Sequence, residues 1–269
     1  MLSEAEYQDK VICGDSAQVL ARLPDCCIHL IVTSPPYDLQ RTYHNFKGFD
    51  FEAIAKQLYR VACEGGVVVW IVNDATVNGS ETGTSMRQAL YFMDIGFRLH
   101  DTMIHEKCGA NFPDRVRYWQ AWEYMFVLSK GKPRVVNLIA DRRNIYAGQK
   151  THGCDRLANG GFKPKVQGRL TPEFGPRFNV WKICHNKRGR FDHPASFAPE
   201  LARDHIASWS SIGDTVLDCF AGSGTTLCAA KALGRHFLGV EISPEYCKLA
   251  ESRLAETKAP ERQALAFAA

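Results

Sequence analysis

This 269-residue chain lacks several features, and each absence narrows what the protein can be. No stretch approaches eighteen consecutive apolar residues, so a membrane-spanning helix is not expected. Residues 1–6 are acidic and lack the basic-then-apolar order of a signal peptide, so we expect a cytoplasmic protein. Hydrophobic residues make up 45% and charged residues 23% of the chain, which is the balance of a soluble protein with a substantial core.

The ten cysteines also lack a recognisable pattern, because none stands in a C-x-x-C pair. A zinc site or a disulfide framework is therefore not expected, and no metal site is predicted. Many of the cysteines fall within apolar runs, as Cys63, Cys219, Cys228 and Cys247 do. This placement favours reduced thiols in the core of a cytosolic protein.

The net charge of +4 is too small by itself to indicate a nucleic-acid partner, but the charge is unevenly distributed. Residues 131–190 contain fourteen basic and three acidic residues, an excess of eleven. A concentrated basic surface suits a polyanion, because each neutralised phosphate releases counterions. The same interval is rich in glycine and shows no clear period, which is typical of a functional insert. A solubilising surface loop is the alternative interpretation.

Outside this interval, strand and helix patterns alternate along the chain. Strand patterns fall at 11–13, 28–32, 67–72, 97–105, 123–128, 215–217 and 237–240, and helical patterns at 17–23, 51–63, 85–93, 199–209, 225–233 and from 244 onward. We expect Gly65 and Gly66 to stop the helix at 51–63 and Gly234 to stop the one at 225–233. The alternation predicts an α/β fold whose mostly parallel sheet is covered on both faces. Residues 1–130 and 191–269 would share this sheet, with 131–190 as an insert.

Two short segments follow strand patterns and carry the most information. Residues 33–37 read TSPPY and come directly after the apolar run at 28–32. Residues 218–226 read DCFAGSGTT and come directly after 215–217. Both are therefore expected to be loops at strand carboxyl ends, the edge where ligands bind in a wound α/β sheet.

The second segment has the character of a nucleotide-type loop. Its glycines allow a tight turn, and the helix that follows begins with free amide donors. No lysine follows Gly224, so the loop is not a phosphate loop of the G-x-x-x-x-G-K-[ST] type. Glu241 lies nineteen positions after Gly222, at the end of the next strand pattern, where it can accept hydrogen bonds from both ribose hydroxyls. The alternative role of Glu241 is a carboxylate leading into the helix capped by Ser243.

Together the two segments resemble the catalytic and cofactor loops of amino-directed DNA methyltransferases, which modify cytosine N4 or adenine N6. Their order, with the catalytic loop first, resembles the beta class of that family. The resemblance covers roughly residues 10–130 and 190–255. It implies a class I S-adenosylmethionine-dependent methyltransferase fold, which is Rossmann-like and has a mixed, mostly parallel sheet with helices on both faces. It also implies S-adenosyl-L-methionine as cofactor, double-stranded DNA as partner, and a target-recognition region at 131–190.

The resemblance further implies how the cofactor is held. Glu241 would hold the ribose, the start of the helix at Thr225 would receive the methionine carboxylate, and Phe220 would lie near the sulfonium or the adenosine. Asp15 resembles the aspartate that meets the adenine amino group, although a helix N-cap is its competing role. The expected cofactor-binding residues are Asp15, His193, Pro194, Asp218, Phe220, Ala221, Gly222, Ser223, Gly224, Thr225, Thr226 and Glu241.

The catalytic residues implied by the resemblance are Ser34, Pro35, Pro36 and Tyr37. An exocyclic amine is a poor nucleophile, so its hydrogens must be held by acceptors, which the Ser34 side chain and the Pro35 carbonyl can supply. Two prolines give a rigid loop, and Tyr37 offers a flat face to a base rotated out of the duplex. The Pro-Cys pair of ring-carbon cytosine methylases is absent. Serine at position 34 favours cytosine N4, with adenine N6 as the alternative; a plain proline turn is the structural alternative.

DNA contacts are expected from the insert and from residues 38–50, which could close over the flipped base. Arginines are the preferred readers of guanine, while lysines mostly hold phosphate. The candidates are Arg41, Lys47, Arg142, Arg143, Lys163, Lys165, Arg188 and Arg190. A companion restriction endonuclease and a homodimer are both compatible with the sequence. Two rival interpretations are an RNA methylase and a cofactor- and DNA-binding protein that has lost turnover.

Overall fold

The computed structural model describes residues 1–36, 49–109, 116–164, 168–184 and 198–260. The chain divides into two compact units. The larger consists of Met1–Asn137 with Asn179–Ala269, and the smaller is Leu138–Phe178. Among the described residues, no helix combines the length and apolar character needed to cross a bilayer.

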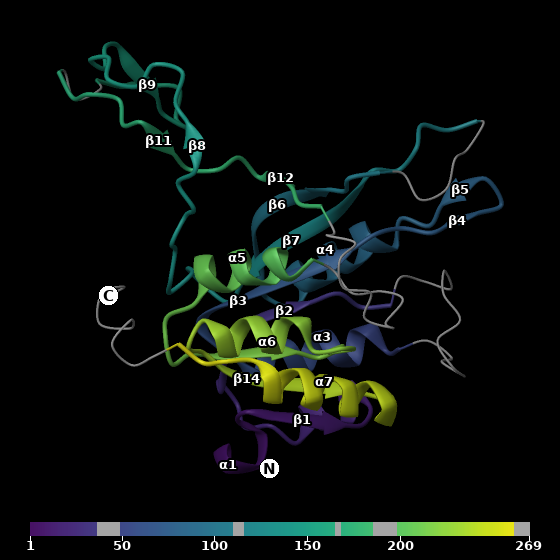
Figure 1. The fold of residues 1–269 in the computed structure, drawn as a ribbon. Helices are drawn as coiled ribbons and strands as arrows, with labels where there is room; N and C mark the ends of the chain where they lie inside the picture. The colour runs from purple at the N-terminus through teal and green to yellow at the C-terminus, as the bar shows by residue number, and fades with distance from the viewer. Residues whose placement is uncertain (37–48, 110–115, 165–167, 185–197, 261–269) are drawn as a thin grey trace. The chain divides into compact units, whose positions relative to one another are not determined.

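The larger unit is built on a sheet whose described strands number eight, in the order β1-β14-β13-β2-β3-β7-β6-β12 (Figure 1). The strands are β1 (Lys10–Cys13), β2 (Ile28–Thr33), β3 (Ala62–Val72), β6 (Arg98–Glu106), β7 (Trp122–Ser129), β12 (Val180–Lys182), β13 (Thr215–Asp218) and β14 (His236–Glu241). Strand β7 runs antiparallel to β3 and β6, and the other described neighbours in the sheet are parallel. The predicted mixed, mostly parallel sheet is confirmed.

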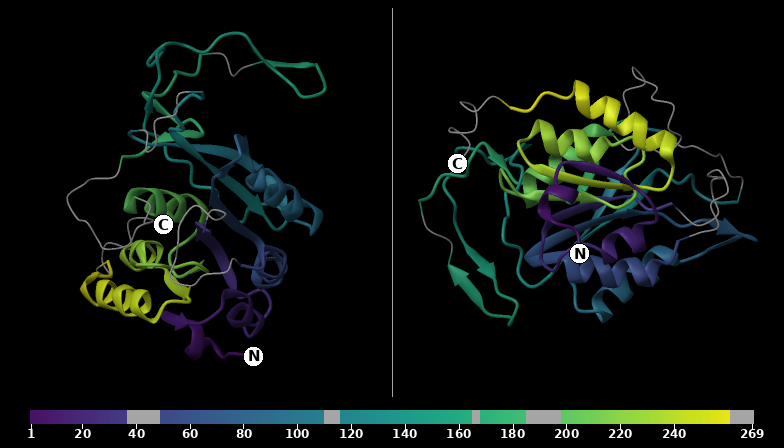
Figure 2. Two further views of the ribbon diagram at one scale, coloured as in Figure 1. Left: turned by 90° about the vertical axis from the view of Figure 1, so that its right-hand side faces the viewer. Right: turned by 90° about the horizontal axis from the view of Figure 1, so that it is seen from below.

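Helices cover both faces of this sheet, as the sequence predicts (Figure 2). One face carries α2 (Ser16–Ala21), α3 (Phe51–Val61) and α4 (Thr84–Asp94); the other carries α5 (Pro199–Trp209), α6 (Thr225–Ala232) and α7 (Pro244–Glu256). A short helix, α1 (Glu4–Tyr7), contacts β1. The alternation of strand and helix along the chain therefore produces the three-layer arrangement expected of this fold class.

Helix α3 shows how local sequence sets an element. The Asp50 side chain accepts a hydrogen bond from the Ala53 amide at 3.0 Å and caps the helix, whose buried face includes Leu58. The predicted stop at Gly65 and Gly66 is wrong, because the helix ends at Val61 and β3 begins at once. Gly65 instead lies inside β3 with φ 74°, where a Cβ would come within 2.9 Å of the Arg134 Cβ. Glycine is required there for close approach between chain segments.

The centre of the core lies around β3. Residues Val67–Ile71 are fully buried, and the Trp70 ring packs against the rings of Phe51 and Phe92 at centroid distances of 5.8 and 5.2 Å. The Trp70 indole nitrogen donates to the Gln88 side chain at 2.8 Å, so its polar group is satisfied within the core. Full burial of each large apolar side chain contributes about 1.5–3 kcal/mol. The strand beside β2 is therefore a rigid support for the edge where the candidate loops lie.

The smaller unit contains little regular structure. Strand β8 (Arg142–Arg143) pairs antiparallel with β11 (Phe174–Gly175), and β9 (Cys154–Arg156) pairs antiparallel with β10 (Phe162–Pro164). This unit, Leu138–Phe178, lies within the irregular interval 131–190 noted in the sequence. Residues Val180–Lys182 lie within that interval but form β12 of the large sheet, beside β6.

The chain reverses its winding between β13 and β2. From β13 it continues through α6 to β14 on one side, and from β2 through α3 to β3 on the other. Crossover connections that diverge in this way leave a crevice at the carboxyl ends of the two central strands, where α/β sheets bind ligands. A further hairpin, β4 (Thr76–Val77) with β5 (Ser80–Glu81), follows β3 beyond the same edge.

Candidate cofactor and catalytic site

The two loops singled out in the sequence lie side by side at this crevice. Strand β2 ends at Thr33 and β13 ends at Asp218, and the strands are paired with Leu217 beside Ile31. Ser34 and Cys219, the first residues after these strands, therefore lie at adjacent strand ends. This register confirms, for the described residues, the prediction that both segments lie at strand carboxyl ends.

Three of the four predicted catalytic residues are described. Pro35 is buried, and Ser34 and Pro36 are half-buried. Tyr37 lies outside the described residues. Because each proline fixes its own φ, the segment leaves β2 along a restricted path, and Ser34 stands one residue beyond the fully buried Thr33.

The glycine loop after β13 has the conformation that its sequence predicts. Gly222 has φ 50° and Gly224 has φ 77°, both in the left-handed region. A Cβ on Gly224 would lie 2.8 Å from the Cβ of Ala250 on α7, so the loop packs tightly against that helix. Helix α6 begins at Thr225 immediately afterwards. Its first amides have no partner within the helix, which suits the carboxylate of a bound ligand.

Glu241 at the end of β14 reaches into the glycine loop. Its Oε2 accepts a hydrogen bond from the Gly222 amide at 2.8 Å, and its Oε1 accepts one from the Ser243 amide at 2.9 Å. The alternative role of Glu241, a carboxylate leading into the last helix, is therefore also present, through its contact with Ser243. Each carboxylate oxygen retains a second acceptor site, so two hydroxyls of a ribose can still be bound.

Asp15 lies at the end of β1, next to Glu241. The Gly14 amide donates to the Glu241 carbonyl at 2.9 Å, which joins the ends of β1 and β14. The Asp15 side chain accepts from the Gln18 amide at 3.0 Å and caps α2. The competing role given to Asp15 in the sequence is thus realised in the structure. His193 and Pro194, the other cofactor candidates outside the loop, lie beyond the described residues.

Asp218 is almost fully buried, with 2% of its surface exposed. Its Oδ1 accepts the Thr33 hydroxyl at 2.6 Å and the Phe220 amide at 3.1 Å. Burial raises the pKa of Asp218 to about 6, and the hydrogen bonds from Thr33, Thr226 and Phe220 oppose that shift. The Asp218 carboxylate therefore links the end of β2 to the glycine loop through hydrogen bonds. The Phe220 ring packs against the Phe49 ring at a centroid distance of 5.0 Å.

Two groups of residues at this edge were not singled out in the sequence. Arg253 of α7 donates to the Ser223 carbonyl, to the Ser223 hydroxyl at 2.8 Å and to the Thr225 hydroxyl at 3.3 Å. These contacts fix the glycine loop against α7. At the end of β3, the Asn73 side chain accepts from Gln120 at 2.8 Å, and Asp74 accepts the Ser85 hydroxyl at 2.6 Å. A helix periodicity could place Arg253 on a face of α7, but no local signal reveals its partners.

The predicted DNA-binding residues fall in different environments. Arg143 and Lys163, on β8 and β10, are exposed. Arg142 is half-buried; its Nε donates to the Pro176 carbonyl at 2.9 Å, and its guanidinium lies 4.6 Å from the ring centroid of Phe178. The remaining candidates, Arg41, Lys47, Lys165, Arg188 and Arg190, lie outside the described residues. Among the described candidates, Arg143 and Lys163 therefore present their charges to solvent.

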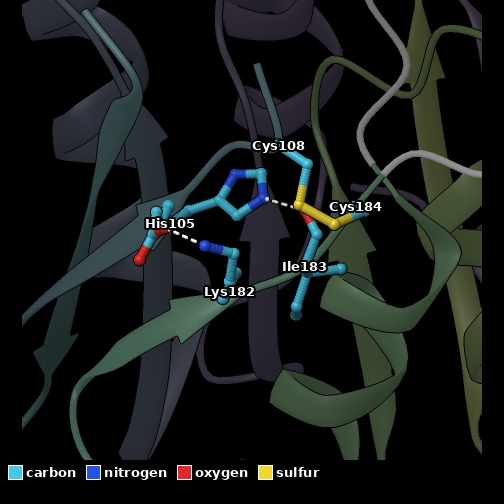
Figure 3. The surroundings of a disulfide bond; sticks show 6 residues. His105, Cys108, Lys182, Ile183 and Cys184 are labelled. Carbon is cyan, nitrogen blue, oxygen red and sulfur yellow. Dashed lines mark hydrogen bonds and ion pairs between the residues drawn. A yellow bond between two sulfur atoms is a disulfide. The ribbon is translucent and has the colours of Figure 1, made fainter.

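The expectation of reduced cysteines is wrong for one pair. Cys108 and Cys184 form a disulfide whose Cα atoms are 5.1 Å apart (Figure 3). Glu106 of β6 pairs with Lys182 of β12, so each cysteine lies two residues beyond the last paired position, and the register brings the two together. Cys63, Cys219, Cys228 and Cys247 are free thiols, as expected.

The buried His105 lies close to this disulfide (Figure 3). Its Nε2 lies 3.1 Å from the Ile183 carbonyl oxygen and its Nδ1 lies 3.5 Å from a Glu123 oxygen, while Lys107 contacts the other Glu123 oxygen. Burial of Glu123 opposes ionisation, but His105 and Lys107 outweigh it and hold the pKa of Glu123 below its ordinary value. These contacts fix the ends of β6 and β12 relative to β7.

The wound sheet, the glycine loop and the acidic residue at the end of β14 match a class I methyltransferase fold, and a solved structure of this fold holds S-adenosyl-L-methionine. A family model described as DNA methylase, which covers N6 and N4 modification, matches residues 28–252. The chain therefore belongs to the family of amino-directed DNA methylases.

Individual proteins agree with this assignment. The orphan methyltransferase M.BamHII of Bacillus amyloliquefaciens is 52% identical over 238 residues, which cover 86% of this chain and 89% of that protein. The Thermus thermophilus protein TTHA0409, solved in complex with S-adenosyl-L-methionine, has a TM-score of 0.62 and 26% identity, covering 92% of this chain and 95% of its own. The PvuII cytosine-N4-specific DNA methyltransferase has a TM-score of 0.66 at 20% identity, covering 96% and 90%, and shows the same fold.

Proposed function

We propose that this methylase transfers a methyl group to N4 of cytosine in duplex DNA at a specific sequence. The observation that carries the choice of base is Ser34, which occupies the first position of the Ser-Pro-Pro-Tyr segment beside the glycine loop. In the family that the chain resembles, serine at this position is associated with cytosine N4 and aspartate with adenine N6.

The catalytic loop would act by holding the amine. The Ser34 hydroxyl and the Pro35 carbonyl accept hydrogen bonds from the two amino hydrogens, which directs the nitrogen lone pair at the methyl donor. Tyr37 stacks on the base after it rotates out of the duplex. When bound, S-adenosyl-L-methionine would supply an electrophilic methyl group for transfer to the amine nitrogen, with its sulfonium as the leaving group. The nitrogen then loses a proton to solvent, so the catalysis consists mainly of alignment and electrostatics.

The residues at the switch point fit this methyl donor. The Glu241 carboxylate is already oriented by two backbone amides, so it can accept two ribose hydroxyls without rearranging. The start of α6 at Thr225 and Thr226 offers amides to the methionine carboxylate. Asp15 would accept a hydrogen bond from the adenine amino group. Phe220, His193 and Pro194 would pack along the cofactor. The remaining loop residues, Ala221 to Gly224, contribute backbone surface.

Sequence recognition is assigned to the basic interval 131–190, of which Leu138–Phe178 forms a compact unit. Arg143 and Lys163 would hold phosphates there, together with Lys165, Arg188 and Arg190. Arg41 and Lys47 would contact DNA close to the flipped base. The 52% identical relative is named an orphan methyltransferase, which supports a solitary enzyme over one that acts with a companion restriction endonuclease.

The decisive experiment is a product analysis. The protein is incubated with unmodified duplex DNA of high sequence complexity and methyl-labelled S-adenosyl-L-methionine, and the DNA is digested to nucleosides and analysed by mass and retention. We expect labelled N4-methylcytosine. Labelled N6-methyladenine would overturn the assignment of the base. Absence of label from DNA, with the cofactor still bound, would contradict the proposed reaction. Ser34→Ala, tested in parallel, should abolish most of the label.

A further inference from the structure

Thr33 and Asp218 form a buried bridge between the two loops. The Thr33 hydroxyl lies 2.6 Å from the Asp218 Oδ1, although the two residues are 185 positions apart in the sequence. Thr33 is the last residue of β2 and Asp218 the last residue of β13. The same Oδ1 accepts the Phe220 amide at 3.1 Å. One oxygen atom therefore receives a donor from the strand that ends in the catalytic loop and another from the cofactor loop.

Core packing alone does not explain this bridge. Thr33 has no exposed surface, and valine has nearly the same shape without a hydroxyl to satisfy. A buried carboxylate is costly unless it is paired. The groups that act on Asp218 are hydroxyls, one backbone amide and the like-charged Glu241, and burial raises the pKa of Asp218 to about 6. Within the described residues, the carboxylate is thus held by hydrogen bonds rather than by a cation.

Further contacts support the same connection. The Thr226 hydroxyl on α6 lies 3.3 Å from the Val32 carbonyl, and the Cys219 thiol lies 3.8 Å from the Thr33 hydroxyl. The ends of β2 and β13 are therefore joined by side chains as well as by their strand register. The catalytic Ser34 follows Thr33 directly, so a displacement of Thr33 is passed on to it with little attenuation.

We propose that Thr33 is a positioning residue, whose hydrogen bond to Asp218 sets the distance between the Ser34–Pro35 acceptors and the methyl donor. The inference rests on the proposed function, because it concerns the alignment of an amine with a methyl group. Thr33 itself does not touch the substrate or the cofactor. A displacement of about 1 Å between reacting groups lowers a rate by roughly 100-fold. The bridge therefore acts on the rate of transfer rather than on the affinity for either ligand.

The experiment compares four variants with the wild-type protein. Thr33→Val removes the hydroxyl and keeps the shape, Thr33→Ser keeps the hydroxyl, and Thr33→Cys keeps only a weak donor. The matched control is Thr215→Val, a buried threonine at the amino end of β13, on the adjacent strand but away from the loops. For each, the single-turnover rate of methyl transfer to unmodified duplex DNA is measured, together with the Kd for S-adenosyl-L-methionine and the Tm.

We expect Thr33→Val to lower the single-turnover rate on the order of 10- to 100-fold while the cofactor Kd stays within about threefold of wild type. Thr33→Ser should retain most of the rate, Thr33→Cys should fall between the two, and Thr215→Val should match wild type. If Thr33→Val is insoluble, Thr33→Cys against Thr33→Ser provides the same comparison.

A wild-type rate in Thr33→Val would overturn the positioning role. So would a parallel loss of rate, cofactor affinity and Tm that Thr33→Ser does not restore, because that pattern belongs to a residue needed only for folding. Failure of the wild-type protein to transfer any methyl group would instead overturn the proposed function. The two failures are therefore distinguishable.

Discussion

The edge of the large sheet and the unit Leu138–Phe178 hold their charged side chains in opposite ways. At the sheet edge, Asp218 is buried and Glu241 is held by two backbone amides. In the smaller unit, Arg143 faces Glu173 at 3.9 Å with both side chains largely exposed. Surface pairs of this kind contribute little to stability and are screened by salt. Transfer of a methyl group requires fixed positions, whereas attraction to phosphates requires only charge in the right region.

The largest effect is expected at the fixed edge, from Ser34→Ala. Loss of one of the two acceptors that hold the amine should lower kcat by about 100- to 1000-fold, the range typical of a lost preorganised polar contact. Cofactor affinity should be unchanged, because the proposed contact of Ser34 is with the base and not with the cofactor. Calorimetric titration with S-adenosyl-L-methionine and a steady-state rate on unmodified DNA measure the two quantities.

The control for this variant is Ser211→Ala, which removes an exposed hydroxyl in the turn between α5 and β13. It should keep the wild-type rate. A full rate in Ser34→Ala would remove the assigned role of that side chain and weaken the contrast between the two regions. Tyr37→Ala should also lose most of the turnover while it keeps the cofactor bound.

The next largest effect is expected from Glu241→Ala. The substitution removes the carboxylate that we propose holds the ribose, and it also removes the hydrogen bond by which Glu241 holds the Gly222 amide in the glycine loop. Each lost hydrogen bond is worth about 1 kcal/mol, so cofactor affinity should fall roughly 10- to 100-fold. Glu241→Gln, with one oxygen acceptor in place of two, should lie between. Glu245→Ala, which removes an exposed acid in the first turn of α7, should bind the cofactor normally. An equal loss there would point to a general effect of charge.

The buried Asp218 predicts an unusual pH dependence of stability. Its pKa rises from the ordinary value of 3.8 to about 6 on folding, because burial disfavours the charged form. The unfolded chain therefore releases this proton first, and the contribution of Asp218 to stability is lost as the pH rises from about 4 to 6. The loss amounts to at most about 3 kcal/mol at 1.36 kcal/mol per pKa unit. Asp218→Asn lacks this titration and still offers an oxygen acceptor to Thr33.

We therefore expect Asp218→Asn to gain stability relative to wild type as the pH is raised from 4 to 7. Urea unfolding of both proteins across this range measures the difference in the free energy of unfolding. A difference that does not change with pH would show that the carboxylate ionises as easily in the folded protein as in the unfolded chain. The rigid edge would then be less desolvated than the burial of Asp218 indicates.

Local patterns were sufficient to predict most of the sheet and the two loops, because each strand and helix carries its own period. They failed where the structure depends on contacts between distant segments. Strand β12 has three residues, which is too short for a period, and it is defined by its pairing with β6. The disulfide joins cysteines 76 positions apart, and the Thr33–Asp218 hydrogen bond spans 185. The role of Arg253 likewise depends on the packing of α7 against the glycine loop.

The smallest effect is expected in the smaller unit, from Arg143→Ala. One lost phosphate contact should weaken DNA binding by about three- to tenfold and reduce the slope of log affinity against log salt by about 0.9. Arg143→Lys keeps the charge and should restore both quantities.

Arg142 is the neighbouring residue, but its side chain contacts Pro176 and Phe178. Arg142→Ala should therefore loosen the pairing of β8 with β11 instead. Salt-dependent binding and hydrogen exchange separate the two. An unchanged salt slope for Arg143→Ala would mean that this exposed charge does not contact DNA. If Arg143→Lys instead lowers the discrimination between DNA sequences, Arg143 contacts a base and not a phosphate.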